Sequence, residues 1–289
     1  MEFDFTGAEL FLAYWAGQAS LQQVLDHPAY RNVCRHAQCF SAGISAQDIV
    51  TAIHEKPSPF YGLEGLSGNL KRIRTLIEII RKNELSWIAI VKNVLLELFP
   101  EENMHITVYP IIGYDMGIGL NEVVCMNCNC ESYLVEPYEF LFFIIHECVH
   151  IIYERHHQVP PLSEVVSMAQ WRSYFNLWTQ NEGYAVYAPL QLRLELGYLA
   201  ERDYRVLFDP KQLKIHREAF LETLNGFQQD QPLTPDECIE SSFGSMRLTY
   251  RMGCELIRCI ENKYGKQAVC KAFYLDGDHF IDMYKCLIM

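Results

Sequence analysis

The first hundred residues carry mostly helical periodicity. Apolar side chains recur at three- and four-residue spacing over residues 70–80 and again over 85–98, and this pattern predicts two helices in succession. Prolines and glycines over residues 57–68 predict a long loop before this pair. Because the helical pattern already begins near residue 8, residues 1–100 are predicted to form a helical N-terminal lobe.

The pattern changes to a strand-like alternation of apolar and polar residues after Pro100. Residues 104–126 are predicted to hold two or three short strands. Gly113, Gly117 and Gly119 lie between these strands. Glycines at such places indicate a sharp turn or a close approach of the backbone to another group.

A long apolar helix is predicted next. Pro137 suits the first turn of a helix, where its missing N–H costs nothing. The helix is predicted to run to His156 or His157, because Pro160 and Pro161 then stop it.

The rest of the chain is predicted to be helical as well. Ser163 is the predicted cap of a helix that ends near Thr179, and a further helical segment follows over residues 181–197. A long helix is predicted from about residue 237 to 264, with Gly265 as its stop. The predicted fold class is therefore α+β, predominantly helical, with a small β-sheet.

Composition and charge exclude several classes of protein. Half of the 289 residues are hydrophobic, which is typical of a globular chain. The net charge of −12 argues against a nucleic-acid partner, because phosphate binding needs a basic surface. No apolar run approaches the roughly 18 residues of a membrane helix, and the first residues do not resemble a signal peptide. We therefore expect a cytoplasmic protein with no membrane partner, whose 11 cysteines are reduced.

The most informative motif is His-Glu-Cys-Val-His at residues 146–150, the HExxH pattern of zinc-binding helices. Because residues four apart lie on one face of a helix, His146 and His150 can bind one metal ion. Glu147 can then accept a proton from a metal-bound water that attacks a polarised carbonyl. This chemistry is amide hydrolysis.

The residues around the motif strengthen this interpretation. Residues 138–145 and 151–153 are apolar around nearly the whole helix, which predicts that the helix is buried. Two imidazoles and a carboxylate buried there would cost roughly several kcal/mol in desolvation unless something pairs with them, and a divalent metal does so. The alternative is a cluster of the same residues hydrogen-bonded to one another. Cys148 is predicted to fill the core on the opposite face of the helix.

A catalytic zinc takes three protein ligands, so one ligand remains to be found. Glu182 is the best candidate, because it lies on a later predicted helix that can return past the first. His156 competes with it, six residues after His150, which is the spacing of the metzincin class. That class needs a turn at the position of Tyr153, where this chain has no glycine, so His156 is predicted to point away from the metal.

The layout of His-Glu-x-x-His followed on a later helix by Asn-Glu-Gly-x-Ala resembles the gluzincin class of zinc metallopeptidases, over residues 137–190. The resemblance implies His146, His150 and Glu182 as ligands of one Zn²⁺ per chain, and Glu147 as general base. It also implies a peptide or protein substrate and a zincin-like core, which we place over residues 101–289. The spacing to Glu182 is longer than in the thermolysin-like members.

Hydrolysis also needs a donor to the developing oxyanion. Tyr250 and Arg247 are the candidates, because Tyr-Arg-Met-Gly at residues 250–253 resembles a Tyr-x-x-Gly step of some predicted gluzincin-like proteases. A helix that merely packs through its glycine is the alternative. Tyr184 and His216 are weaker candidates.

Two further sets of residues have both a functional and a structural interpretation. Glu154, four residues after His150, is either the acid that orients that histidine or a surface acid at a helix end. Cys125, Cys128 and Cys130 have spacings that suit a metal, but no fourth ligand is evident, which favours packed cysteines.

The sequence thus predicts a zinc metallopeptidase, with a rival of another class. A non-catalytic binding or regulatory protein would keep the same helix as a metal-stabilised structural element. A fourth protein ligand on the metal would favour that rival, and an open position faced by Glu147 would favour the enzyme.

Overall fold

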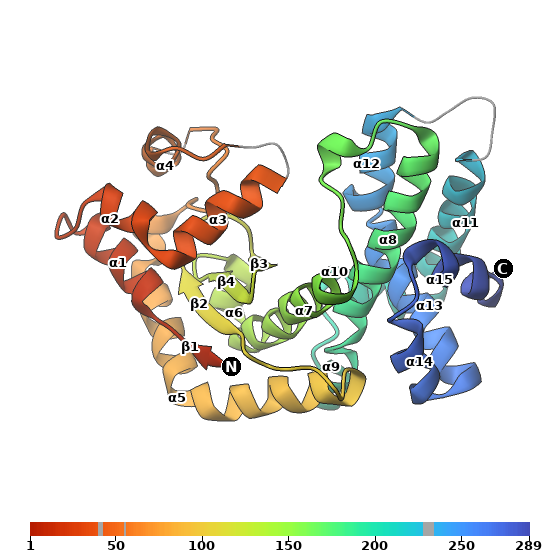
Figure 1. Cartoon of the computed structure of the whole chain (residues 1–289). Coiled ribbons are helices and arrows are strands. Elements are labelled where there is room, and N and C mark those ends of the chain that lie inside the picture. Colours follow the sequence, from red (N-terminus) through yellow and green to blue (C-terminus); the bar gives the residue numbers. More distant parts are fainter. Residues whose placement is uncertain (40–42, 55, 228–233) are drawn as a thin grey trace. The chain divides into compact units, whose positions relative to one another are not determined.

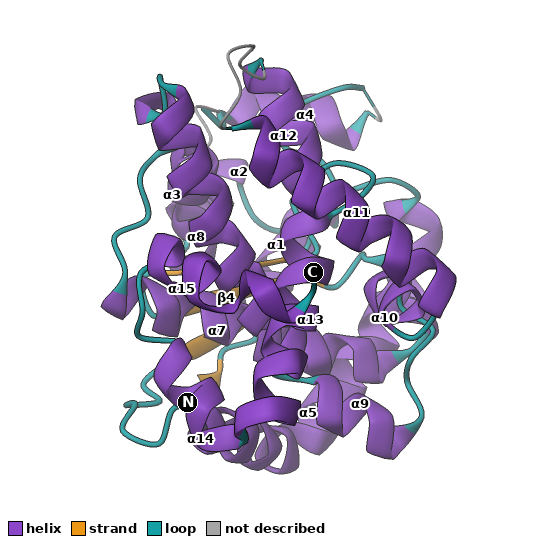
Figure 2. Ribbon diagram, turned by 90° about the vertical axis from the view of Figure 1, so that its right-hand side faces the viewer, coloured by secondary structure: helices purple, strands orange, loops and turns teal. Residues whose placement is uncertain are grey.

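The computed structural model describes residues 1–39, 43–54, 56–227 and 234–289 (Figure 1). Helices make up most of these residues and strands only a small part, as the colours of Figure 2 show. The predicted α+β class with a predominance of helix is therefore confirmed.

By its internal packing the chain divides into two units. The first comprises residues 1–96 and 101–151, and the second comprises residues 97–100 and 152–289. The division falls inside the helix that carries the HExxH motif.

The first unit is built on one small sheet. Its strand order is β1-β2-β4-β3, in which β1, β2 and β4 run parallel and β3 runs antiparallel to β4 at the edge. The sequence predicted two or three strands here and missed the shortest one, at the N-terminus. The strands are β1 (Glu2–Phe3), β2 (Thr107–Ile111), β3 (Gly117–Leu120) and β4 (Val123–Asn127).

Seven helices accompany this sheet within the described part of the first unit, and the last residues of the fifth and the seventh belong to the second unit. They are α1 (Thr6–Trp15), α2 (Leu21–Asp26), α3 (Pro28–Cys39), α4 (Ala46–Ile53), α5 (Leu66–Leu98), α6 (Glu131–Val135) and α7 (Pro137–His156). Two of the N-terminal helices pack on the sheet, because α1 contacts β2 and α3 contacts β3 and β4.

The two helices predicted over residues 70–98 are a single helix, α5. The polar run at residues 81–84 looked like a break, but it contains neither glycine nor proline, so the backbone continues through it. The helix also begins at Leu66, and Gly68 lies in its first turn rather than in the preceding loop.

The second unit consists of helices in the residues that the structure describes. They are η1 (Leu162–Glu164), α8 (Met168–Tyr187), α9 (Leu190–Leu196), α10 (Arg202–Leu207), α11 (Pro210–Gly226), α12 (Pro235–Phe243), α13 (Leu248–Tyr264), α14 (Lys266–Ala272), α15 (Gly277–Tyr284) and η2 (Lys285–Leu287). The predicted stops at Gly197 and Gly265 are confirmed, since α9 and α13 end directly before them.

Three predicted boundaries in this unit are wrong. The cap of α8 is Ser167, whose hydroxyl accepts a hydrogen bond from the Gln170 N–H, whereas Ser163 lies in η1. Helix α8 does not end near Thr179 but continues to Tyr187. The Thr179 hydroxyl donates a hydrogen bond to the Phe175 carbonyl at 2.7 Å, so this polar side chain is accommodated inside the helix.

The third error is the long helix predicted from about residue 237 to 264. It is two helices, α12 and α13, separated at residues 244–247. Arg247 precedes α13 with φ 45° and ψ 48°, a left-handed conformation that is costly for any residue with a Cβ.

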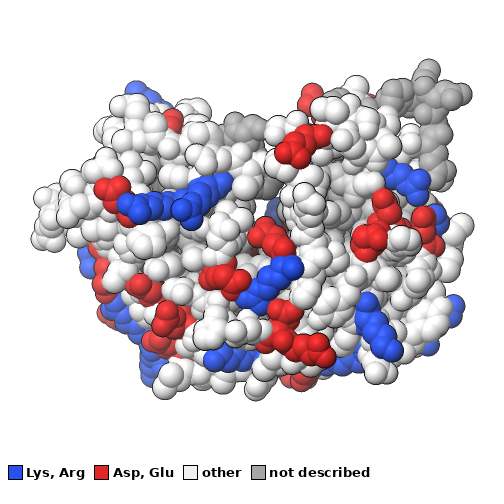
Figure 3. Space-filling model, viewed as in Figure 1, with Lys and Arg blue, Asp and Glu red and all other residues white. Residues whose placement is uncertain are grey.

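No helix in the described ranges is both long enough and apolar enough to cross a membrane. Acidic and basic side chains are interspersed over the face of the molecule that Figure 3 shows.

Candidate metal site

The two motif histidines lie on the same face of α7, in the first unit. Both are half-buried, and their Nε2 atoms are 3.1 Å apart. The rings are nearly perpendicular, at 84°, with centroids 4.8 Å apart. Two imidazole nitrogens that converge this closely are arranged as the i and i+4 ligands of one ion would be.

A third histidine of the first unit lies beside this pair. His36 on α3 shares a hydrogen bond of 3.1 Å with the Tyr114 hydroxyl through its Nδ1. Burial, and then the charge of His150, lower the pKa of His36 to about 4. No sequence pattern singles out His36, because its place depends on how α3 packs.

Glu147 is buried on α7 against the edge strand β3. A Cβ added at Gly117 would lie 2.8 Å from Oε1 of Glu147, and one added at Gly119 would lie 2.2 Å from its backbone oxygen. The expectation that these glycines allow a close approach is therefore confirmed. Only residues without a Cβ let β3 lie this near to the glutamate.

Glu182 is buried on α8, in the second unit, and a glycine contact determines which helix lies beside it. A Cβ added at Gly183 would meet Gly253 of α13 at 2.5 Å, and one added at Gly253 would meet the Thr179 carbonyl at 2.0 Å. The backbones of α8 and α13 therefore cross in direct contact. The alternative interpretation of Gly253, as a packing residue, is confirmed.

This crossing places Tyr250 of α13 next to Glu182. The two side chains are hydrogen-bonded to each other. Burial, and then the charge of Glu182, raise the pKa of Tyr250 well above its usual range, so the hydroxyl stays protonated and donates to the carboxylate. The predicted oxyanion donor is thus a partner of the predicted third ligand.

The last turns of α7 belong to the second unit, and there they are tied to α8. The Tyr153 hydroxyl donates to Oε1 of Gln180 at 2.8 Å. The amide of Gln180 in turn donates to the carbonyls of Ala272 at 2.9 Å and Leu275 at 2.8 Å. Tyr153 follows His150 by one helical turn, and Gln180 precedes Glu182 by two residues.

His146 and His150 belong to the first unit and Glu182 to the second. The donors that the sequence predicts for one metal ion are thus two imidazoles on α7 and a carboxylate on α8. Two imidazoles and a carboxylate are the donor set of many catalytic zinc sites, so the residues present fit zinc.

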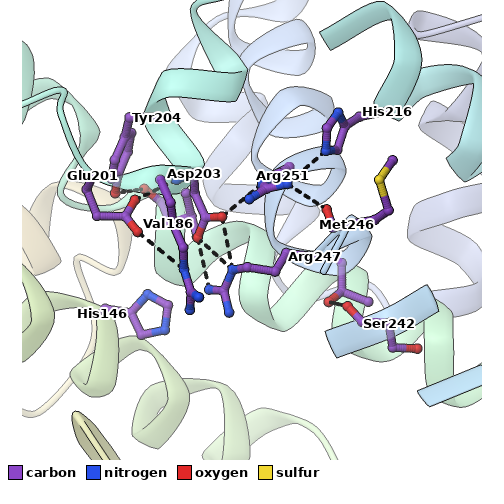
Figure 4. A network of polar contacts seen from close by, with 12 residues as sticks. His146, Val186, Glu201, Asp203, Tyr204, His216, Ser242, Met246, Arg247 and Arg251 are labelled. Carbon is purple, nitrogen blue, oxygen red and sulfur yellow. Dashed lines mark hydrogen bonds and ion pairs between the residues drawn. The ribbon is translucent and has the colours of Figure 1, made fainter. Parts of the chain in front are cut away.

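A buried ion-pair network surrounds the start of α13 (Figure 4). Asp203 of α10 accepts hydrogen bonds from Arg247, through Nε at 3.0 Å and Nη2 at 2.9 Å, and from Nε of Arg251 at 2.9 Å. Arg251 also contacts Nε2 of His216 at 2.8 Å. Asp203 was not among the predicted site residues, because nothing in the sequence relates it to an arginine 44 residues later.

This network accounts for His216, whose Nδ1 donates to the Gln212 carbonyl at 2.8 Å. Tyr184, the other weak candidate for the oxyanion donor, donates its hydroxyl to the Val269 carbonyl at 2.6 Å in a fully buried position. Both side chains therefore stabilise the packing of the second unit.

The remaining predicted residues are placed as follows. His156 is exposed and its ring packs edge-on against Tyr274, with centroids 4.9 Å apart. Glu154 is exposed as well. Cys125, Cys128 and Cys148 are buried with free thiols, and burial raises the pKa of Cys125 and Cys128.

In comparisons with known proteins, the chain matches no protein-family model, no curated protein and no solved structure.

Proposed function

We propose that this protein is a zinc-dependent metallohydrolase, a peptidase of gluzincin type with a zincin-like core, in which His146, His150 and Glu182 hold one zinc ion. The observation that carries the proposal is the convergence of the His146 and His150 Nε2 atoms to 3.1 Å on one face of α7, with the buried carboxylate of Glu147 next to His146 on the same helix. The contact of Tyr153 with Gln180 supports it, because it ties α8 to α7 one turn beyond His150.

Zinc bound there would polarise a carbonyl group and acidify a water molecule. Glu147, next to His146 on α7, would accept the proton of the attacking water and later deliver it to the leaving amine. Its buried position under β3 holds the carboxylate in one place and keeps bulk water from it. These roles describe the hydrolysis of an amide bond.

An extended peptide is the substrate that suits the sheet. Strand β3 lies at the edge of the sheet order, paired with β4 on one side. A sheet edge offers backbone N–H and C=O groups to a peptide that adds as a further strand. Because β3 also carries the glycines that contact Glu147, such a peptide would pass close to the proposed base.

Substitution Glu147→Gln tests the proposal, with Glu139→Gln as the matched control on the same helix. The purified proteins would be analysed for zinc and assayed on a panel of fluorogenic peptides. We expect about one zinc per chain in all three proteins. Hydrolysis should fall at least about a hundredfold in Glu147→Gln alone, because an amide cannot accept the proton.

Two results would overturn the proposal. A wild-type protein that stays free of zinc after supplementation has no site of this kind. A zinc-loaded protein that hydrolyses no peptide is better explained as a metal-stabilised binding protein.

A further inference from the structure

We infer that Tyr250 is a positioning residue for Glu182, held in place by Arg247 and Asp203, so that one carboxylate oxygen is fixed by the tyrosine and the other is left for the metal. This inference rests on the proposed function, because it takes Glu182 to be a metal ligand. All the contacts that carry it lie within the second unit.

Helices α8 and α13 are in direct contact close to Glu182 and Tyr250. Gly183 adjoins Glu182 and lies against Gly253, which follows Tyr250 by three residues on α13. The Cβ distances of 2.5 Å and 2.0 Å leave no room for any other residue at either position. The backbones of the two helices are therefore in direct contact at this point, one residue from Glu182 and three residues from Tyr250.

An arginine restricts the orientation of the Tyr250 ring. The guanidinium of Arg247 stacks on this ring, with its central carbon 3.4 Å from the ring centroid. A planar cation stacked on an aromatic face restricts rotation of the ring and adds cation–π attraction. Arg247 thus restricts the orientation of the Tyr250 ring.

Arg247 is itself held in place by its backbone conformation and by Asp203. Its backbone has φ 45°, and its guanidinium makes a forked contact with Asp203 at 2.9 to 3.0 Å. A left-handed residue with a Cβ costs about 1–3 kcal/mol and persists only where its surroundings fix it. The buried pair with Asp203, whose side chain is 4% exposed, is what fixes it here.

The Glu182 carboxylate needs a donor to fix its orientation. A carboxylate has two oxygens and rotates between equivalent positions unless a donor holds one of them. Donors behind a metal ligand fix its orientation, and their loss typically costs about 10- to 100-fold in metal affinity. Tyr250 is the donor that orients Glu182 in this way.

The second unit offers a matched control for the tyrosine. Tyr204 is buried, and Arg193 stacks over its ring at 4.5 Å, as Arg247 does over Tyr250. Its hydroxyl, however, donates to the backbone carbonyl of Val186 at 2.8 Å and not to a carboxylate. Tyr204→Phe therefore removes a buried hydroxyl without touching Glu182.

The experiment compares Tyr250→Phe, Arg247→Lys and Tyr204→Phe with the wild type. Zinc affinity would be measured by chelator competition, the melting temperature on the metal-free proteins, and kcat and KM on a peptide substrate. We expect Tyr250→Phe to weaken zinc binding about 10- to 100-fold. Arg247→Lys should act in the same direction more weakly, and Tyr204→Phe should leave the affinity unchanged.

The outcomes separate this inference from the proposed function. Unchanged zinc affinity in Tyr250→Phe, with a loss of kcat only, would overturn the inference and make Tyr250 a donor to the reacting oxyanion. An equal loss of affinity in Tyr204→Phe would overturn it too, because the effect would then come from general destabilisation. A wild-type protein without zinc affinity would overturn the proposed function itself.

Discussion

A single methyl group at Gly117 should reduce hydrolysis while leaving the fold intact. Gly117 lies on β3 opposite Glu147, and its φ is not positive, so an alanine fits the backbone there. The new Cβ would lie 2.8 Å from Oε1 and 2.9 Å from Cγ of Glu147. Substitution Gly117→Ala therefore acts directly on the proposed general base.

The size of the effect follows from these distances. Ordinary contact of a Cβ with another heavy atom begins at 3.4 Å, so the carboxylate must withdraw by about 0.6 Å. A misplacement of 1 Å at a reacting group costs about a hundredfold, so we expect a loss of roughly ten- to a hundredfold in kcat/KM. Stability should fall by only about 1 kcal/mol, because the end of a flexible side chain moves aside.

Two other glycines bracket this result. Gly68 on α5 has nothing within 4 Å of an added Cβ, so Gly68→Ala should keep full activity. An added Cβ at Gly119 would meet the backbone oxygen of Glu147 at 2.2 Å, so Gly119→Ala should lower the melting temperature markedly. The assay is peptide hydrolysis with zinc content and thermal unfolding measured on each variant. Full turnover in zinc-loaded Gly117→Ala would refute the placement of Glu147 as base.

Three further predictions concern the site, a helix cap and pH. Glu182→Ala should weaken zinc binding by at least about a hundredfold in chelator competition, because the loss of a ligand costs more than the loss of a residue that only orients a ligand. His156→Ala should leave zinc binding unchanged. The reverse ranking would favour the metzincin-like spacing. Ser167→Ala should lower the free energy of unfolding in urea by about 1 kcal/mol and Ser163→Ala by much less, and equal losses would contradict the observed cap. The pKa of His36 is lowered from 6.5 to about 4 in the folded protein, so the unfolded chain binds this proton more tightly. The metal-free protein should therefore lose roughly 1–3 kcal/mol of stability as the pH falls from 6.5 toward 4. His36→Gln should flatten that part of the pH profile, and an unchanged profile would show that His36 is not its cause.

The parts of the fold that the sequence predicted well are those with local causes. Helix α7 begins at Pro137 and ends at His156, four residues before Pro160, which cannot continue it. The stop at Gly197 is equally local, since its φ of 80° is one that glycine adopts at little cost. Signals of this kind depend on a few neighbouring residues and on nothing elsewhere in the chain.

The errors arise where a local signal is ambiguous or a distant contact overrides it. Ser163 and Ser167 are both followed after a short interval by residues that suit a helix, and only Ser167 has a glutamine three positions later to complete a capping box. The polar run at residues 81–84 separates the two apolar stretches from which two helices were predicted, yet it contains neither glycine nor proline. Neither case could be decided from hydrophobic periodicity alone.

The same distinction applies to the candidate site. The pair of histidines on α7 follows from one helical turn, so the motif predicted it directly. Gly117 and Gly119 were recognised as places of close approach, but the identity of the group they approach depends on the packing of β3 against α7. The glycines thus indicated that a neighbour exists and not which neighbour it is.

The break before α13 is the clearest case of a distant cause. Arg247 has a Cβ and yet adopts a left-handed backbone conformation, which costs about 1–3 kcal/mol. Asp203, 44 residues earlier, offsets that cost, because a carboxylate that is 4% exposed needs close cationic partners. The strained backbone turns the guanidinium toward both Asp203 and the ring of Tyr250. A helix running straight through residue 247 would give up this arrangement, and with it the stacking that holds Tyr250 beside Glu182.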